Sequence, residues 1–205
     1  MIITKAGAKG GVAKTIGSIY LATILTNLGF TVRVLDGDPQ GSATRWSLQA
    51  RRNKAPLPFE VKTTNKAELE FEIDDPTLTD DVDVVIIDTA PGDPGVMDAA
   101  IELSDLTVVC TKPSIDDVHQ AKAVVENSGD NICSILITQV DKRTKGWSVL
   151  QDDLADRNLP IFGTIISQKV DYTEVFGTLP TNLDNYTELW DEICEDFPQL
   201  IPVKD

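Results

Sequence analysis

Short runs of β-branched and other apolar residues alternate along this chain with longer stretches in which apolar positions recur every three or four residues. The short runs predict six strands, at residues 2–6, 31–36, 83–88, 106–110, 132–138 and 161–166. The longer stretches predict helices at residues 15–28, 42–52, 95–103, 115–127, 147–157 and 184–197. Several strand runs are apolar at every position, which is typical of a sheet covered on both faces. We therefore predict an α/β fold, a mostly parallel twisted sheet with helices on both faces.

Composition narrows the class of protein. The chain has 205 residues and a mass of 22.4 kDa, which fits one domain spanning residues 1–205. The longest fully aliphatic run, 84–87, is far shorter than the roughly 18 residues of a membrane span, and the first residues lack an export-signal pattern. Cys110, Cys133 and Cys194 are spaced neither as a close pair nor as metal ligands. We expect a cytoplasmic protein that does not associate with a membrane.

Acidic residues dominate the charge. Eighteen Lys and Arg against 33 Asp and Glu give a net charge of -15 and a pI near 4.3, a balance that repels nucleic acid and anionic lipid at long range. Basic residues group in two places, Arg45, Arg51, Arg52 and Lys54, and then Lys142, Arg143 and Lys145. Any contact with DNA must therefore be local, and a solvated surface is the simpler interpretation of either group alone.

A glycine-rich turn follows the first predicted strand and leads into the first predicted helix. It reads Gly7-Ala8-Lys9-Gly10-Gly11-Val12-Ala13-Lys14-Thr15, and Ile16 opens the helical pattern. Gly10 and Gly11 allow successive backbone N–H groups to face inward, and the helix start adds free donors and a partial positive charge. Lys14 can reach the β and γ phosphates of a nucleotide, and Thr15 offers the hydroxyl that a bridging Mg²⁺ needs. The turn therefore predicts a phosphate cradle.

This cradle departs from the strict pattern G-x-x-x-x-G-K-T, because Ala8 and Ala13 occupy its two glycine positions. If Ala13 adopts a left-handed backbone conformation, the cost is about 1 to 2 kcal/mol. We expect such strain to weaken nucleotide binding without abolishing it.

Two further predicted strands end in acidic residues, the second at Asp36-Gly37-Asp38 and the third at Asp88-Thr89-Ala90-Pro91-Gly92. The carboxyl ends of parallel strands meet at one edge of the sheet, beside the phosphate loop. We expect Asp88 to hold the water shell of Mg²⁺, with Thr15 and Asp36 as further metal candidates. Asp38 or Asp36 is expected to orient the attacking water. The Pro-Gly turn can respond to loss of the γ phosphate.

Together these segments resemble the ParA/MinD family of deviant Walker-motif ATPases, and in particular ParA-like partition ATPases. Residues 9–15 resemble the family's K-G-G-x-G-K-T, residues 36–42 its D-x-D-P-Q-G-S/N, residues 88–92 its D-T-P-P-G, and residues 112–117 its Q-P-S-x-x-D, with Asp117 on the motif's acid. The resemblance covers most of the chain. It implies a compact P-loop ATPase without an N-terminal helix-turn-helix domain.

The resemblance also implies cofactors, residue roles and partners. ATP and Mg²⁺ would be bound by residues 9–16, namely Lys9, Gly10, Gly11, Val12, Ala13, Lys14, Thr15 and Ile16, with Lys9, Lys14 and Asp38 as catalytic residues. In the family, the lysine at the position of Lys9 reaches the phosphates of the opposite subunit in an ATP-bound homodimer. Such a dimer binds DNA nonspecifically on the nucleoid, and an adaptor or centromere-binding protein stimulates hydrolysis. The cargo would be a plasmid, a chromosome region or a protein compartment such as a carboxysome.

Two other functions stay open. A metabolic ATP-dependent ligase resembling dethiobiotin synthetase shares the phosphate loop and the sheet, but Lys9 argues against it. A nonhydrolysing, nucleotide-gated scaffold or polymer is favoured if Ala13 impairs turnover. Ser167 and Gln168 stand where many relatives have Pro-Arg near the nucleotide and the DNA, so the base contacts and the DNA affinity are open. If DNA is bound by a dimer, we expect Lys142, Arg143 and Lys145 to touch its phosphates.

Overall fold

A six-stranded parallel sheet forms the centre of the protein, in the strand order β3-β2-β4-β1-β5-β6. The computed structural model describes residues 1–155, 159–168 and 175–203. The strands are β1 (Ile2–Ala6), β2 (Val32–Gly37), β3 (Glu60–Thr63), β4 (Val84–Thr89), β5 (Leu106–Thr111) and β6 (Cys133–Ile137). Every residue of β4 and β5 is buried, which explains why the apolar runs at 84–87 and 108–110 do not alternate with polar residues.

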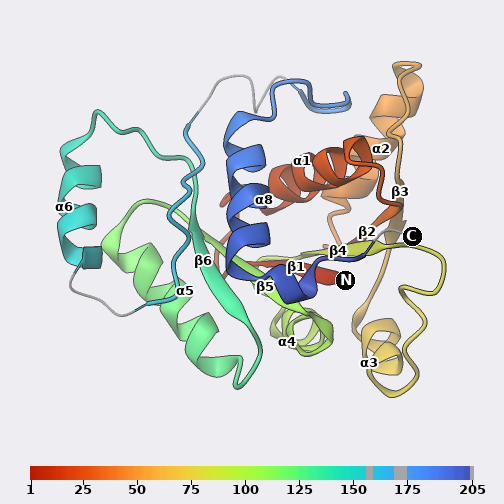
Figure 1. The fold of residues 1–205 in the computed structure, drawn as a ribbon, viewed down its shortest axis with the longest axis horizontal. Helices are drawn as coiled ribbons and strands as arrows, with labels where there is room; N and C mark the ends of the chain where they lie inside the picture. Colours follow the sequence, from red (N-terminus) through yellow and green to blue (C-terminus); the bar gives the residue numbers. More distant parts are fainter. Residues whose placement is uncertain (156–158, 169–174, 204–205) are drawn as a thin grey trace.

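Helices cover both faces of this sheet (Figure 1). On one face lie α1 (Lys14–Asn27), α2 (Ser42–Arg52) and α8 (Asp184–Asp196), and on the other lie α3 (Lys66–Asp74), α4 (Pro94–Leu103) and α5 (Ile115–Asn127). Helix α6 (Lys145–Ala155) lies beyond β6, and a short 3-10 turn spans Pro198–Leu200. The predicted α/β architecture is confirmed, and five of the six predicted strands are present to within one residue at each end.

The largest core cluster lies between the sheet and the α1, α2 and α8 layer. It contains Ile3, Val34, Ile86, Val108 and Leu136 from the strands, together with side chains of these helices such as Ile19, Trp46 and Trp190. Alternate strand residues pack on the opposite face, against α3, α4 and α5. This two-sided packing fixes the carboxyl ends of the strands, where the phosphate loop and the acidic turns begin.

The predicted strand at 161–166 is wrong. Only isolated bridges form there, between Ile135 and Ile161 and between Val140 and Ser167. The backbone N–H groups of Gly163 and Thr164 instead donate to the Glu192 carboxylate of α8, at 2.5 and 2.8 Å. On either side, Phe162 N–H donates to Ile135 O and Ile166 N–H donates to Ile137 O, so the helix side chain interrupts the pairing with β6 in the middle of the segment. The end of the predicted helix 147–157 falls on residues 156–158, outside the described part of the chain.

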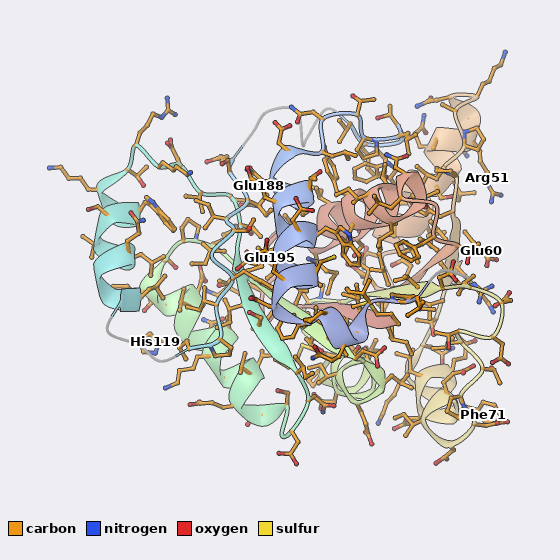
Figure 2. All side chains as sticks on the ribbon, in the orientation of Figure 1. Arg51, Glu60, Phe71, His119, Glu188 and Glu195 are labelled. Carbon is orange, nitrogen blue, oxygen red and sulfur yellow. The ribbon has the colours of Figure 1, made fainter. Side chains whose placement is uncertain are left out.

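Two elements were missed by the sequence pattern, the edge strand β3 and the helix α3. Three of the four residues of β3 are exposed, and Leu69 is the buried residue of α3. Figure 2 shows Phe71 of α3 at the outer edge of the molecule, where its side chain is 61% exposed. Apolar periodicity cannot reveal elements that bury so little.

No helix within the described ranges combines the length and the apolar composition of a membrane span. Charged side chains instead line the outer surfaces. Figure 2 shows Glu188 and Glu195, two exposed residues of α8, on the same side of the molecule.

Candidate functional site

The phosphate loop places two residues in the left-handed backbone region. Gly11 has φ 69° and Ala13 has φ 60°, so the position that the strict motif gives to glycine does require this conformation here. Ala13 is also the N-cap of α1, and within the described residues no side chain caps this helix. The first N–H groups of α1 therefore stay available to an anion, because a helix start leaves its donors without intrahelical partners.

The side chain of Lys14 contacts the backbone of this loop. Its side chain is buried, and Nζ donates to the carbonyl oxygens of Lys9 at 3.2 Å and Gly7 at 3.4 Å. Burial lowers the pKa of Lys14, and the charges of Asp88 and Asp38 oppose that shift. Two loop carbonyls are weak partners for an ammonium group compared with a phosphate. The Lys14 ammonium group is therefore positioned near the start of α1, where it can exchange these carbonyls for a phosphate.

Asp88, at the end of β4, lies beside the first turn of α1. Thr15 Oγ1 donates to Asp88 Oδ2 at 2.6 Å, and Ser18 Oγ donates to Asp88 Oδ1 at 3.2 Å. Burial raises the pKa of Asp88 to about 7, and the neighbouring charge of Asp36 adds to this shift. A carboxylate with this pKa gains from a nearby divalent cation, and a hydroxyl with a carboxylate is an oxygen donor set that suits Mg²⁺.

Asp36 lies directly opposite Asp88 in the β2 and β4 register, but its carboxylate holds backbone groups. Oδ1 accepts the N–H of Asp38 at 3.3 Å, and Oδ2 accepts the N–H of Thr44 at 2.7 Å. Asp36 thereby organises the loop that leads into α2. Asp38 is more exposed, and its Oδ1 accepts the N–H of Gln40 at 2.8 Å.

A cavity of about 440 Å³ lies at the start of α1. Residues 11–16, Asp38, Thr89 and Pro91 line it, so the structure brings most of the predicted site residues together. Among the predicted residues, Lys9, Gly10, Asp36 and Asp88 do not line this cavity. Asp36 and Asp88 are buried, and Asp88 is joined to the lining residue Thr15 by a hydrogen bond.

Three further residues line the cavity. Gln139, after β6, has φ 57°, and its Nε2 donates to Gly11 O at 2.7 Å. Trp46 is buried on α2, and Phe176 is 47% exposed with its ring 5.4 Å from that of Trp46. The sequence analysis missed Trp46 and Phe176 as site residues, because they reach the cavity only through the tertiary fold.

The aromatic wall is fastened to α2. Trp46 Nε1 donates to Thr178 O and Asn53 Nδ2 donates to Gly177 O, both at 2.8 Å. Gly177 has φ 74°, and a Cβ there would lie 2.3 Å from Gln49 Cγ, so this close approach requires glycine. The segment that carries Phe176 is therefore held by the helix that follows Asp36 and Asp38.

Lys9 does not line the cavity and forms an ion pair with Asp117 at the start of α5. Asp117 also accepts the hydroxyl of Ser114, the N-cap of α5, at 2.7 Å. The hydrogen bond from Lys9 is the main reason that the pKa of Asp117 is lowered. The side chain of Lys9 is 47% exposed, so this contact competes with water and is easily exchanged.

The basic group after β6 is at the surface. Lys142, Arg143 and Lys145 are exposed, but Arg143 forms an ion pair with Asp141 at 2.9 Å. Hydrogen bonds from Arg143 lower the pKa of Asp141 to about 2. Arg51 of the other basic group lies on α2 at the edge of the molecule (Figure 2). Ser167 and Gln168 occupy the position where many relatives have Pro-Arg. Here the N–H of Ser167 donates to Asn185 Oδ1, and the N–H of Gln168 donates to Val140 O.

Comparisons with known proteins agree with this geometry. Residues 3–178 match the family described as the CobQ/CobB/MinD/ParA nucleotide binding domain. No curated protein sequence matches the chain.

Several solved structures share the fold. A plasmid partition protein from Borrelia burgdorferi B31 bound to AMPPNP is 19% identical, with a TM-score of 0.72 over 97% of this chain and 98% of that one. An ATP complex of a McdA variant from Cyanothece is 16% identical, with a TM-score of 0.71 over 100% and 97%. Cobyrinic acid a,c-diamide synthase from Mycobacterium smegmatis with ADP and magnesium is 20% identical, with a TM-score of 0.66 over 98% of both chains.

Proposed function

This chain belongs to the CobQ/CobB/MinD/ParA nucleotide-binding family, and we propose that it is an ATP-hydrolysing positioning switch of the ParA type. The observation that carries this proposal is the convergence, at one cavity, of an uncapped helix start, the buried Lys14 and the Thr15–Asp88 pair. We include all of residues 1–205 in one P-loop domain, because α8, beyond the family match, packs on α1.

ATP and Mg²⁺ are the ligands that fit these residues. The N–H groups of residues 11–16 and the Lys14 ammonium suit the phosphates. Thr15 and Asp88 suit the metal, Thr15 through its hydroxyl and Asp88 through bound water. Asp36 is a weaker metal candidate because both of its oxygens hold backbone N–H groups. Asp38 lines the cavity, and because its Oδ1 accepts the N–H of Gln40, its second carboxylate oxygen is proposed to orient a water for attack.

Lys9 is proposed to join two copies of the chain. Its ion pair with Asp117 keeps it on its own subunit while exposing about half of the side chain. A triphosphate offered by a second copy carries more negative charge than one carboxylate and is a stronger partner. ATP binding and homodimerisation would then be one event, with Lys9 exchanging Asp117 for the phosphates of the other subunit.

The dimer is proposed to bind DNA nonspecifically and to release it after hydrolysis, which an adaptor or centromere-binding protein stimulates. Lys142, Arg143 and Lys145 are the candidate DNA contacts, since they are exposed and lie together after β6. The net charge of -15 requires that these contacts be local. The partition protein and McdA among the structural neighbours are consistent with a positioning role.

The decisive experiment measures mass by light scattering and phosphate release with ATP and Mg²⁺. The wild type is expected to double its 22.4 kDa mass and to release phosphate. Lys9→Ala should bind ATP and stay monomeric, and Asp38→Ala should form the dimer without turnover. Lys122→Ala, on the outer part of α5, is the matched control and should behave as wild type. A Lys9→Ala protein that is fully active as a monomer would favour a metabolic ligase instead.

DNA binding is tested by pull-down with and without ATP over a range of salt concentrations. Charge reversal at Lys142, Arg143 and Lys145 should abolish the ATP-dependent retention, because each lost phosphate contact lowers affinity and the salt slope. Charge reversal at Lys62, Lys66 and Lys122 changes the net charge equally and should leave more of the retention. Equal losses in the two variants would mean that the patch after β6 is not the DNA site.

A further inference from the structure

Helices α2 and α3 each expose a large apolar side chain to solvent. Leu48 of α2 is 49% exposed, and Phe71 of α3 is 61% exposed. The two helices lie on opposite faces of the sheet, and the edge strand β3 lies between them in the chain (Figure 1). In Figure 2, Arg51 of α2, Glu60 of β3 and Phe71 all lie along one edge of the molecule. Neither apolar residue lines the nucleotide cavity, so the proposed ATPase does not account for their exposure.

The charges around these two apolar residues are opposite in sign and equal in spacing. Three residues before Leu48, and three and four residues after it, the chain has Arg45, Arg51 and Arg52. At the same three spacings from Phe71 it has Glu68, Asp74 and Asp75. All six charged side chains are exposed, and none of them forms an ion pair with another residue in the described ranges. Their charges are therefore available to a second molecule.

The buried positions show that each charged set lies on the outer side of its helix. Trp46 is 2% exposed and Leu69 is 1% exposed, and each stands two residues before the exposed apolar residue. Residues three and four apart share one side of a helix, so each apolar residue has its charged neighbours on the side away from the sheet. The apolar residue is central in each set, and the two sets therefore match whether the helices run parallel or antiparallel.

We infer that the outer face of α2 in one copy of the chain binds the outer face of α3 in a second copy. Leu48 covers Phe71, and the arginines around it meet the carboxylates around Phe71. A second copy is the partner that fits, because one chain carries both faces and the spacing of one set is repeated in the other. Within a single copy the sheet separates the two faces. Each contact thus leaves one α2 face and one α3 face free, to which further copies can add.

The net charge of the chain gives this contact a distinctive salt dependence. A charge of -15 makes the copies repel one another, and added salt screens that repulsion. Nonspecific association should therefore increase with salt, whereas a contact between arginines and carboxylates should decrease. Exposed ion pairs are individually weak, so we expect association at high protein concentration and low salt.

Sedimentation velocity of the full chain, without nucleotide and freed of nucleic acid, measures this association. At about 0.5 mM protein and about 20 mM salt, the average mass of the wild type is expected to exceed 22.4 kDa. In about 0.5 M salt it should return to the monomer mass. Phe71→Ser should weaken the association about 5-fold. Val149→Ser, at a 56% exposed position of α6, is the control and should not.

Reversing the charges of one face, and then of both, tests the pairing directly. Arg45→Glu/Arg51→Glu/Arg52→Glu and Glu68→Lys/Asp74→Lys/Asp75→Lys should each weaken the association at least about 10-fold, because both faces then have one sign. An equimolar mixture of the two variants should regain it, since each face again finds an opposite one. Both sets of substitutions in one chain should also restore it.

The matched control for this restoration uses charges elsewhere on the surface. It combines the arginine reversal with Asp191→Lys/Glu195→Lys/Asp196→Lys, at exposed positions of α8 and its end. This chain has the same net charge as the wild type and as the chain with both faces reversed, but its α2 and α3 faces are both acidic. It should stay monomeric. The circular dichroism spectrum of each variant shows whether it has folded.

The inference is wrong if the wild type stays monomeric under these conditions, if its association rises with salt, or if reversing both faces fails to restore it. Nucleic acid retained by the wild type and lost by the arginine variant, without any self-association, would assign the α2 face to nucleic acid and overturn the inference. Phosphate release tests the proposed function separately. An ATPase that does not associate without nucleotide would refute this contact alone, and an associating chain without turnover would refute the ATPase alone.

Discussion

Helices α1 and α2 have similar N-caps, but the acid beside each helix start accepts hydrogen bonds from different groups. Each follows a central strand, each has an N-cap residue in the left-handed region, Ala13 at φ 60° and Gly41 at φ 63°, and neither cap residue accepts a hydrogen bond with its side chain. At α2, Asp36 from the preceding strand accepts the N–H of Thr44. At α1, the acid at the same level of the sheet, Asp88, is bonded by the hydroxyls of Thr15 and Ser18 instead.

The difference separates a structural helix start from a ligand-binding one. The carboxylate of Asp36 fills the anion position at α2 within the protein, so that end needs no ligand. At α1 the carboxylate is held below the helix by side chains, and the backbone donors remain directed at the cavity above Lys14. Two neighbouring acids thus decide which helix end can accept a phosphate.

The largest effect is expected when the cation of the open helix end is removed. Lys14→Ala leaves the N–H donors of α1 without the ammonium group that assists them, and we expect ATP affinity to fall at least about 100-fold, equivalent to about 2.7 kcal/mol. Titration with a fluorescent ATP analogue measures it, and Lys122→Ala provides the control. Unchanged affinity in Lys14→Ala would mean that the cavity is not the phosphate site.

The next effect concerns the pH dependence of the acid below α1. The pKa of Asp88 is about 7 in the folded protein and about 3.9 when unfolded, so ionisation is disfavoured by folding. The stabilisation is complete below about pH 4 and is lost as the pH rises through about 7. Without Mg²⁺, the free energy of unfolding should fall by about 2 kcal/mol between about pH 5.5 and 8.5 from this group.

Urea unfolding at these two pH values, for the wild type and Asp88→Asn, isolates this contribution as a difference. The variant should lack the fall that Asp88 causes, and Mg²⁺ should stabilise the wild type at high pH more than the variant. Parallel pH profiles in the two proteins would show that Asp88 ionises as freely as an exposed carboxylate.

A smaller effect is expected at the filled helix end. Asp36→Ala removes the acceptor for the N–H groups of Asp38 and Thr44, and the free energy of unfolding should fall by about 1 to 2 kcal/mol. Asp38→Ala removes a more exposed acceptor, that of Gln40 N–H, and serves as the control with a loss below about 0.5 kcal/mol. Equal losses would remove the distinction between the two acids.

The smallest effect is expected from replacing the N-cap residue of α1, Ala13, by the glycine that α2 has at its own N-cap. Ala13→Gly relieves the left-handed strain at φ 60°, and after the entropy cost of glycine we expect a gain of about 0.5 to 1 kcal/mol in unfolding free energy. Ala8→Gly, where φ is not positive, should lose about that amount. Thermal unfolding of both variants checks the opposite signs, and a loss in Ala13→Gly would contradict a strained cap.

The central strands and the phosphate loop were predictable because their signals are local. Residues 84–87 are aliphatic since both faces of β4 are buried, and the order of Gly11, Lys14 and Thr15 fixes the cradle by itself. The strand predicted at 161–166 is interrupted because the carboxylate of Glu192, distant in sequence, accepts the N–H groups of Gly163 and Thr164 in its middle. The same limit applies to Trp46 and Phe176, which reach the cavity only after the chain has folded.

The expected roles of Asp36 and Asp88 illustrate how far a pattern can go. Both end a strand and both are buried, and the uninterrupted aliphatic run before Asp88 is the reason that the sequence favours this acid for Mg²⁺. The distinction depends on which donor approaches each carboxylate, the Thr44 N–H or the hydroxyls of Thr15 and Ser18. The sequence therefore identifies both acids as candidate site residues, and the packing of α1 and α2 determines which donors each carboxylate binds.

The hydrogen bond from Trp46 Nε1 to Thr178 O means that a movement of α2 can be followed by the fluorescence of Trp46. If the Asp36–Thr44 loop rearranges when nucleotide is exchanged, α2 carries the indole with it and alters its contact with Phe176. With Trp147 and Trp190 replaced by Phe, the emission of the remaining indole follows that movement in real time, without any attached dye.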